Sequence, residues 1–440
     1  MAEQIIEIKI TGLTSRGEGL GRVGGLVVFV PGALPGEIVW ARHLQVKKNF
    51  GRAELAKIIL PSSERAVPAC PVCAACGGCA LQHLKYQAQL FWKKQWLTDA
   101  LQRVGGLVAE VKPTIGAKQP TGYRDRVQLH ADWQDGVLNL GFYRRGSREL
   151  TKGAPCLILR PLIARLKLLL DELPPSQVKY LTGLQHVALR CDSRGEQAML
   201  ILVGEIDQAE LCKPIAWLME QEPRLISVWA NGGRPVYGIY GANWRKLAGV
   251  DKLSDSLGGL RLRISPGSFT QINAAQAERL YQLAVQYAGL SGAETVLDAY
   301  CGIGVIALYL ADKAQSVIGV EQYAPAVADA RFNAKLNGIN NCRFVAGRVE
   351  EVLPLLMAQG QTIQAAVLDP PRVGCAAPAL KALAKLGPKR IIYVSCDPAT
   401  LARDASLLCE VGYTLREAQP LDMFPHTGHV EAVAVLEAKS

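Results

Sequence analysis

No stretch of the 440-residue sequence approaches the length of apolar chain that a membrane span requires. Met1 is followed by a charged segment and not by the apolar core of a signal peptide, so we expect a cytoplasmic protein without a membrane partner. None of the 12 cysteines forms a Cys-x3-Cys-x2-Cys triple, which excludes the radical enzymes that need one. In a cytoplasmic protein, cysteines are thiols, metal ligands or catalytic groups more often than disulfides.

A glycine-rich loop is present, but it lacks the third glycine of a dinucleotide-binding fingerprint. Residues 295–298 predict a buried strand that ends at Asp298, and only Gly302 and Gly304 follow it before a predicted helix. The next predicted strand ends at Glu321, about 20 residues after the loop, where a carboxylate accepts hydrogen bonds from ribose hydroxyls. Because the loop lacks a cradle for pyrophosphate, a cofactor with ribose and no phosphate, such as S-adenosylmethionine, suits it better.

Two more predicted strands end in residues that can take part in catalysis. Residues 366–368 lead into Asp-Pro-Pro-Arg at 369–372, where two prolines make a rigid turn that can hold Asp369 in place. Residues 391–394 lead into Ser-Cys-Asp-Pro at 395–398, which puts the thiol of Cys396 at the carboxyl edge of a sheet, where α/β sheets bind ligands. A thiolate at that edge can act as a nucleophile. Arg372 stands where adenine-N6 methyltransferases have an aromatic residue, which counts against an amino group as the target.

The positive charge of the chain is concentrated in its N-terminal third. The net charge is +10, and residues 1–160 hold 22 Lys and Arg against 12 Asp and Glu, whereas the rest is nearly balanced. A local basic excess beside a neutral region predicts a surface that binds a polyanion. Residues 1–60 also read as four or five short strands with Gly-rich turns, the pattern of a small OB-like barrel.

Four cysteines crowd together at a regular spacing of three residues. They are Cys70, Cys73, Cys76 and Cys79. Such a group predicts a metal site, and thiolates suit both zinc and iron–sulfur clusters. The spacing only partly matches a bacterial ferredoxin run, because the last gap is short and no proline follows Cys79.

Taken together, these motifs resemble the RNA uracil-5-methyltransferases that use S-adenosylmethionine. Five motifs carry the resemblance: Ser-Phe-Thr-Gln-Ile-Asn at 268–273, the loop at 298–304, Asp-Pro-Pro-Arg at 369–372, Ser-Cys-Asp-Pro at 395–398 and His-Val-Glu at 429–431. The resemblance implies that Cys396 is the nucleophile and Glu431 the base. The cofactor-binding residues that it implies are Gln271, Tyr300, Gly302, Glu321 and Asp369. The substrate-binding residues that it implies are Arg126, Phe269 and Asp369.

The chemistry of this reaction explains the residue types. Uracil C5 is a poor nucleophile until a thiolate attacks C6 and breaks the conjugation of the ring. After methylation at C5, a base must remove the C5 proton so that the cysteine is expelled. The reaction therefore needs at least one soft nucleophile and one carboxylate base, and Cys396 and Glu431 supply them.

The sequence departs from the family pattern in a few places. Ala299 replaces a larger residue, Val305 replaces a polar one, and Asp397 stands where Asn is common. These changes put fine cofactor contacts in doubt. The family's Cys-x5-Cys-x2-Cys pattern with one remote cysteine implies a 4Fe–4S cluster and leaves Cys73 spare. The implied ligands are Cys70, Cys76, Cys79 and Cys156.

We therefore expect an α/β protein in three parts. Residues 1–60 form an OB-like barrel that resembles the RNA-binding TRAM domain, residues 61–264 a mixed α+β central domain with the cluster, and residues 265–440 a Rossmann-like methyltransferase domain. The family implies that a predicted helix over residues 86–103 packs on the methyltransferase domain.

The barrel and the cluster together favour 23S ribosomal RNA as the partner and a monomeric enzyme. A tRNA target is the alternative, although tRNA members of the family usually lack the barrel. An RNA cytosine-5-methyltransferase is less favoured, because Arg372 stands where such enzymes have a second cysteine. A module that only binds RNA would leave Cys396, Asp369 and Glu431 without a role.

Overall fold

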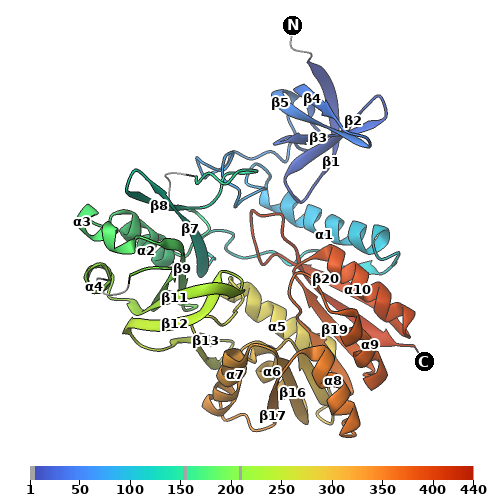
Figure 1. Ribbon diagram of the computed structural model, residues 1–440. Helices are drawn as coiled ribbons and strands as arrows, with labels where there is room; N and C mark the ends of the chain where they lie inside the picture. The colour runs from blue at the N-terminus through green and yellow to red at the C-terminus, as the bar shows by residue number, and fades with distance from the viewer. Residues whose placement is uncertain (1–4, 152–155, 208–210, 440) are drawn as a thin grey trace.

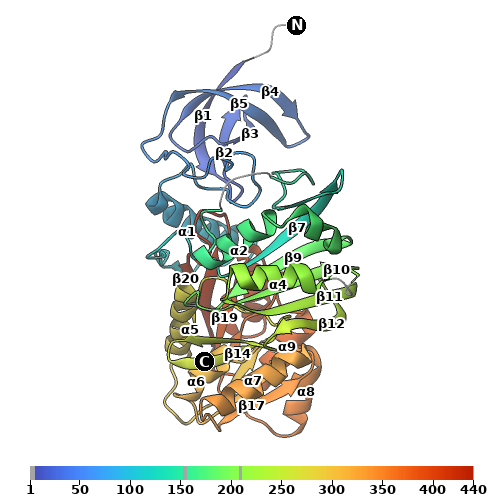
Figure 2. The same ribbon diagram turned by 90° about the vertical axis from the view of Figure 1, so that its left-hand side faces the viewer.

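The computed structural model describes residues 5–151, 156–207 and 211–439. Figure 1 shows a small barrel at the N-terminus, a central sheet with helices on one side, and a large sheet with helices on both faces. In Figure 2, turned by 90°, the barrel lies above the central sheet, and the catalytic sheet lies behind and below it, with β17 at the bottom. Within the described ranges, no helix is long and apolar enough to span a membrane.

The N-terminal strands form a closed barrel in the order β1-β2-β3-β5-β4. Their bounds are β1 Ile6–Leu13, β2 Glu18–Val23, β3 Leu26–Pro31, β4 Ile38–Val46 and β5 Phe50–Leu60. Alternate residues of β1 point inward, so Ile8 and Ile10 pack with Val28, Val30 and Val39 in the core of the barrel. The predicted barrel is confirmed.

Helix α1, Tyr86–Arg103, has the bounds that the sequence predicts. Its buried side chains Leu97 and Leu101 lie in one hydrophobic cluster with Leu401 and Ala402 of α10, Pro398–Glu410. The helix therefore packs on the catalytic sheet, as the family resemblance implied, although about 300 residues separate the two helices in sequence.

The central part is a six-stranded sheet in the order β12-β11-β10-β9-β7-β8. Its strands are β7 Arg126–Gln134, β8 Val137–Gly141, β9 Leu184–Cys191, β10 Ala198–Gly204, β11 Leu225–Tyr237 and β12 Tyr240–Gly249. Helices α2, Pro161–Asp171, and α4, Cys212–Gln221, bury their apolar faces against one side of this sheet. The short helices α3 Pro175–Val178 and η1 Lys179–Leu181 connect α2 to β9. A separate hairpin, β13 Leu253–Leu257 and β14 Leu260–Ile264, leads to the catalytic part.

The catalytic sheet has eight strands in the order β17-β16-β15-β18-β19-β21-β20-β6. The bounds are β6 Glu110–Val111, β15 Thr295–Ala299, β16 Ser316–Glu321, β17 Cys342–Ala346, β18 Ala365–Leu368, β19 Arg390–Ser395, β20 Tyr413–Leu421 and β21 Glu431–Ala438. Strands β15 to β19 are parallel, and β21 runs antiparallel to β19. Strand β6 comes from the segment before the central sheet, so the catalytic sheet draws a strand from outside residues 265–440.

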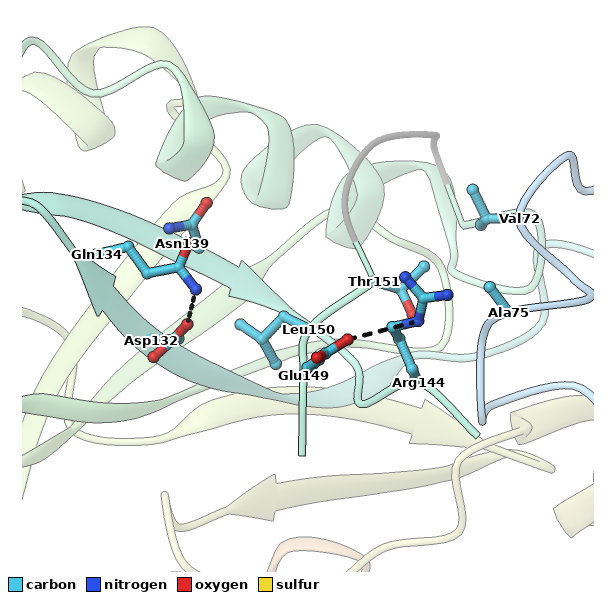
Figure 3. A pocket seen from close by; sticks show the side chains of 9 residues that line it. All are labelled: Val72, Ala75, Asp132, Gln134, Asn139, Arg144, Glu149, Leu150 and Thr151. Carbon is cyan, nitrogen blue, oxygen red and sulfur yellow. Dashed lines mark hydrogen bonds and ion pairs between the residues drawn. The ribbon is translucent and has the colours of Figure 1, made fainter. Parts of the chain in front are cut away.

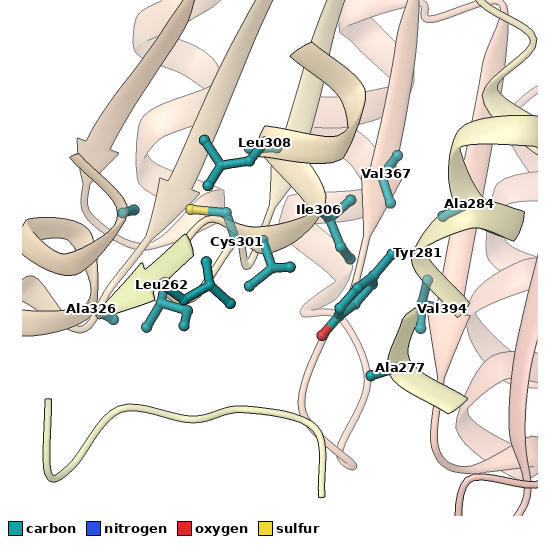
Figure 4. Packing of buried hydrophobic residues seen from close by; sticks show 14 of the residues in the cluster. Leu262, Ala277, Tyr281, Ala284, Cys301, Ile306, Leu308, Ala326, Val367 and Val394 are labelled. Atoms are coloured by element: carbon teal, nitrogen blue, oxygen red, sulfur yellow. The ribbon is translucent and has the colours of Figure 1, made fainter. Parts of the chain in front are cut away.

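Alternate residues of these buried strands feed two separate cores, one on each face of the sheet. One face is covered by α5 Ala274–Ala288, α6 Val305–Ala311 and α7 Ala324–Leu336, and Figure 4 shows part of this packing. The other face is covered by α8 Val349–Ala358, α9 Ala377–Leu386, α10 and α1. The Rossmann-like arrangement that the sequence predicts is confirmed.

Candidate active site

Four predicted site residues, together with Asp298, lie at the carboxyl edge of the catalytic sheet. Asp298 lies in β15, Glu321 ends β16, Asp369 follows β18 and Cys396 follows β19. These strands are parallel, so their carboxyl ends share one edge. Glu431 begins β21 and reaches the same edge because β21 is antiparallel to β19.

Cys396 is fixed at the turn between β19 and α10. The Asp397 side chain caps α10 by accepting hydrogen bonds from the backbone N–H groups of Ala399 and Thr400, both at 3.0 Å, and Pro398 begins the helix. Aspartate and asparagine are equally good caps, which explains why Asp397 is accepted where the family often has Asn. The half-buried thiol therefore lies on a rigid turn at the carboxyl edge of the sheet.

Charged groups around Cys396 act on its thiol in opposite directions. Burial and the charges of Glu431 and Asp369 raise the pKa of the Cys396 thiol, the Arg372 guanidinium lowers it, and the net pKa is about 12. Arg372 is thus the cation that favours the thiolate. Its Nη2 atom also lies 3.2 Å from Nδ1 of His429, two residues before Glu431. The sequence analysis used Arg372 only as an argument against an amino-group target and missed this position.

Glu431 and Asp298 are buried carboxylates without partners. Each is 1% exposed or less, and neither oxygen of either group has a hydrogen-bond partner in the described part of the chain. Burial, followed by the charge of Asp369, raises the pKa of both groups well above the ordinary range. Burial raises the pKa of Asp369 itself to about 7. Three acids in so small a space create a pocket that attracts a cation.

The loop that precedes Glu431 is held by α1. The ammonium group of Lys93 donates to Asp422 Oδ1 at 2.5 Å and to the carbonyl oxygens of Phe424 at 3.1 Å and His429 at 2.8 Å. The side chains of Lys93 and Asp422 are fully buried. The sequence analysis placed Lys93 on a helix but gave no sign of this partner.

The glycine loop after β15 has the geometry of a nucleotide-binding turn. Tyr300, Gly302 and Gly304 all have positive φ angles, of 66°, 53° and 85°. For Tyr300 this left-handed conformation is strained, and such strain collects at functional sites. Glu321 closes the loop by accepting hydrogen bonds from the backbone N–H groups of Gly302, at 3.1 Å, and Tyr323, at 2.7 Å.

The two residues predicted to lie near the target base, besides Asp369, stack on each other. The Arg126 guanidinium carbon lies 4.9 Å from the centre of the Phe269 ring, and Phe269 is 44% exposed. The segment that carries Phe269 is anchored by Ser265 and Ser268, whose hydroxyls donate to the buried carboxylate of Asp329. An exposed cation–aromatic pair on a fixed segment can stack on an unpaired base.

The predicted cluster ligands come together in one cavity next to the central sheet. Its lining includes the thiols of Cys70, Cys76, Cys79 and Cys156 and also that of Cys73, which the sequence analysis left aside. Burial raises the pKa of Cys79 to about 12 and also raises the pKa values of Cys73 and Cys156. In the described residues, no group of three or more His, Cys, Asp or Glu side chains is arranged to hold a single metal ion.

A shallow hollow of about 470 Å³ lies beside this cysteine segment (Figure 3). Asp132, Gln134 and Asn139 of the β7–β8 hairpin line one end, and an ion pair of 3.9 Å between Arg144 and Glu149 lies at the other. None of these residues belongs to the carboxyl edge of the catalytic sheet, so the hollow is separate from the candidate active site.

Cys375 is a buried packing residue. It is 6% exposed, its backbone N–H donates to Asp404 at 2.7 Å, and the same carboxylate accepts from the Tyr393 hydroxyl at 2.5 Å. This packing role argues against a cytosine-type enzyme with two active-site cysteines, as the sequence analysis expected.

Comparisons with known proteins agree with this geometry. The sequence matches the tRNA (Uracil-5-)-methyltransferase family over residues 256–439 and the TRAM domain over residues 1–56. An uncharacterized RNA methyltransferase of Listeria innocua is 38% identical over 99% of this chain and 98% of that protein. Another, of Halalkalibacterium halodurans, is 38% identical over 99% of this chain and 97% of that protein.

A solved structure extends the likeness to the whole chain. The tRNA (uracil-54, C5)-methyltransferase of Pyrococcus abyssi, in complex with S-adenosyl-L-homocysteine, has a TM-score of 0.75 and 27% identity, and the match covers 98% of this chain and 100% of that chain. The chain therefore belongs to the family of S-adenosylmethionine-dependent RNA uracil-5-methyltransferases and carries an N-terminal TRAM domain.

Proposed function

We propose that this enzyme methylates C5 of a uridine in 23S ribosomal RNA through a covalent bond between Cys396 and C6 of the base. The observation that carries the proposal is the pairing of β19 with β21, which sets a thiol and a partnerless carboxylate side by side at the carboxyl edge of the sheet. A nucleophile and a base close together are the pair that this reaction requires.

The proposed catalytic residues act one after another. Arg372 stabilises the thiolate of Cys396, which attacks C6 and makes C5 nucleophilic. S-adenosylmethionine supplies an electrophilic methyl group when it is bound. Glu431 then accepts the C5 proton, and its buried position makes it a stronger base than an exposed carboxylate. Loss of that proton expels the Cys396 thiolate and restores the aromatic ring.

The site suits S-adenosylmethionine by its charge. The cofactor carries a sulfonium and an ammonium group, and Asp298, which is buried, and Asp369, which is partly buried, are acids that gain from a nearby cation. Glu321, at the end of β16, is placed to accept hydrogen bonds from ribose hydroxyls. Gln271, Tyr300 and Gly302 complete the proposed cofactor site.

The barrel and the Arg126–Phe269 pair are the proposed RNA contacts. Trp40 of β4 is 39% exposed, and the Lys57 ammonium lies 5.6 Å from its ring, so this face offers both stacking and charge. We assign RNA binding to residues 1–60, the cysteine site and further RNA contacts to residues 61–264, and catalysis to residues 265–440. The cytoplasmic location and the monomeric state stay predictions.

We also propose that Cys70, Cys76, Cys79 and Cys156 hold a 4Fe–4S cluster. The support is that four thiols from two distant segments line one cavity. Zinc is the alternative ligand of such a thiol set. The cysteine segment is tied to the strand region by hydrogen bonds from Gly77 N–H to the Tyr143 carbonyl at 3.0 Å and from Arg145 to the Cys79 carbonyl at 3.1 Å. A cluster there would fix the shape of a basic loop.

A tRNA target is the second candidate. The Pyrococcus abyssi protein, named as a tRNA methyltransferase, matches nearly the whole of this chain, so the barrel alone does not decide between the two RNAs. The barrel together with the cysteine set supports ribosomal RNA.

The test is to map 5-methyluridine in 23S ribosomal RNA and in tRNA from cells with and without the gene. Each RNA is then methylated in vitro with the purified enzyme and with Cys396→Ala. We expect one or more ribosomal positions to lose the modification and only the wild-type enzyme to restore it. Loss confined to tRNA would assign the tRNA target instead. Turnover by Cys396→Ala would overturn the covalent mechanism.

A further inference from the structure

A small polar cavity lies between the central sheet and the catalytic sheet, next to the cofactor loop. Its volume is about 30 Å³. On the central side it is lined by Asp125, Arg190 and Asp255, and on the catalytic side by Gln271, Tyr281 and Val305, among others. Since a water-sized group needs about 10–15 Å³, the cavity has room for two or three such groups.

The cavity adjoins the proposed active site. Gln271 is one of the predicted cofactor residues, and Val305 begins α6 directly after the glycine loop. Tyr281 of α5 lines the cavity and also lies close enough to Asp369, Glu431 and Asp298 for their charges to raise the pKa of its phenol, after burial as the main cause. Figure 4 shows its hydroxyl pointing away from Ala284 and Val367.

Asp125 is a buried acid in this cavity and is only 7% exposed. The charges of Arg160, Arg126 and Arg190 act on its carboxylate, but no hydrogen bond joins that carboxylate to them in the described part of the chain. Its backbone is fixed, because its N–H donates to Ile272 at 3.0 Å and its carbonyl accepts from Cys191 at 2.8 Å. Burying a carboxylate without a directly bound partner is costly, so a cationic ligand that bonds to Asp125 would be stabilised here.

Arg190 supplies the opposite charge in the same cavity. It is 4% exposed, and its guanidinium donates to the Ser265 carbonyl at 3.1 Å and to the Thr270 hydroxyl at 2.8 Å. A guanidinium has five N–H donors, so donors are left over after these two contacts. No ion pair joins Arg190 to Asp125, although both are described residues that line one cavity.

An acid and a base held apart in a cavity of this size match the two ends of a zwitterion. The amino-acid end of S-adenosylmethionine is such a group, with an ammonium and a carboxylate on one carbon. We propose that Asp125 binds the ammonium group and Arg190 the carboxylate group of the cofactor's amino-acid end. The inference rests on the use of S-adenosylmethionine by this enzyme.

The cofactor loop itself offers no polar side chain where α6 begins. Val305 presents only an apolar surface to the cavity at this position. Asp125 and Arg190 provide from the central sheet the polar contacts that the loop itself does not make. The central sheet then takes part directly in cofactor binding.

The test uses two ligands that share the adenosine and the sulfur and differ at the amino-acid end. S-adenosylhomocysteine has both the ammonium and the carboxylate, and 5′-methylthioadenosine has neither. Calorimetry with the full-length protein measures both affinities in the wild type, in Asp125→Asn and in Asp192→Asn. Asp192 is the matched control, because it is a buried acid outside the cavity whose Oδ1 already accepts from the backbone N–H groups of Glu196 and Gln197, and an amide oxygen can do the same.

We expect Asp125→Asn to lower the affinity for S-adenosylhomocysteine at least tenfold and to change the affinity for 5′-methylthioadenosine less than twofold. Asp192→Asn should change both affinities less than twofold. An unchanged affinity for S-adenosylhomocysteine in Asp125→Asn, or equal weakening of both ligands, would overturn the proposal. A wild type that binds neither ligand would overturn the cofactor assignment as a whole, which is a separate failure.

A third ligand distinguishes the role of Asp125 from the role of Arg190. The decarboxylated analogue S-adenosyl-3-methylthiopropylamine keeps the amine and lacks the carboxylate. Asp125→Asn should weaken it as strongly as it weakens S-adenosylhomocysteine, whereas Arg190→Gln should weaken only S-adenosylhomocysteine. Thermal melting of each variant shows whether it is folded. If Arg190→Gln is unfolded, the Asp125→Asn comparison still decides the role of the acid.

Discussion

Ser395 of β19 lies directly opposite Ala432 of β21 in the antiparallel ladder. The residue after Ser395 is Cys396 and the residue before Ala432 is Glu431, so both leave the ladder at the same edge of the sheet. Because register in a sheet is fixed by the side-chain pattern of both faces, this pairing cannot slip by one residue without turning a buried face outward. The proposed nucleophile and the proposed base are therefore held together by backbone hydrogen bonds.

Arg372 is expected to set the pH at which Cys396 becomes reactive. A cation beside a thiol favours the thiolate, so removing it raises the pKa of Cys396. In Arg372→Met, the pH profile for alkylation of Cys396 by iodoacetamide should shift to alkaline pH by about one unit or more. Mass spectrometry of the peptide that carries Cys396 follows the reaction. Arg348→Met, which removes an exposed arginine paired with Glu350, is the control and should not shift the profile.

The buried pair of Lys93 and Asp422 is expected to contribute strongly to stability. Lys93→Met leaves a buried carboxylate without its cation, which typically costs about 3–5 kcal/mol. Urea denaturation measures the free energy of unfolding. The double variant Lys93→Met/Asp422→Leu removes both charges and should recover part of the loss, whereas Lys94→Met should change stability by about 0.5 kcal/mol or less. A small effect of Lys93→Met would show that the loop before Glu431 is held by other contacts.

The RNA-facing role of the barrel is best tested by point changes and not by deletion. Leu13 of the barrel packs with Leu81 and Leu84, and a Cβ atom at Gly428 would lie 1.5 Å from the Ser15 carbonyl oxygen. The barrel thus touches the cysteine segment and the loop before Glu431, and its removal would disturb both.

Replacing Lys47, Lys48 and Lys57 of the barrel by Ser should weaken RNA binding and flatten its salt dependence. Each lost phosphate contact lowers the slope of log K against log salt by about 0.7 for single-stranded RNA, so three contacts give about 2. Lys389 and Lys439, at the amino edge of the catalytic sheet, serve as control positions, because they lie opposite the site. An unchanged slope would show that this face of the barrel does not meet RNA.

The 4Fe–4S cluster proposed for the cavity lined by Cys70, Cys76, Cys79 and Cys156 should give the protein a visible colour. Anaerobic purification should give a brown protein with broad visible absorption, which Cys76→Ser should abolish. Cys73→Ser should keep the colour, and this variant is informative because Cys73 lines the same cavity as the four proposed ligands. Iron and sulfide analysis supplies the measurement. A colourless protein with stoichiometric zinc would contradict the cluster.

The sequence was sufficient wherever the signal is local. Apolar runs that end in Asp298, Glu321, Asp369 and Cys396 predicted the parallel strands and their shared edge, and the pattern over residues 86–103 predicted α1 with its bounds. A short apolar run after Glu431 was enough to suggest a strand beside β19, because it had few other places to pair.

Contacts between segments that are distant in the sequence could not be predicted from it. Lys93 and Asp422 are 329 residues apart, and a lysine on a helix gives no sign in the sequence that it is buried. β6 has two residues, too few for any periodic pattern. Asp125 stands between Arg124 and Arg126 in the sequence, and only the fold brings it into one cavity with Gln271 and Val305.

Glu431→Gln should separate the two halves of the reaction. The amide keeps the size of the side chain but cannot accept the C5 proton, so attack by Cys396 and methyl transfer proceed while elimination stalls. The variant should accumulate as a covalent complex with methylated RNA, visible as a retarded band on a denaturing gel that depends on S-adenosylmethionine. Cys396→Ala/Glu431→Gln is the control and should give no band. Normal turnover by Glu431→Gln, or free RNA without any adduct, would show that another group removes the proton, and Asp369, the acid whose charge acts on Glu431, would be the next residue to change.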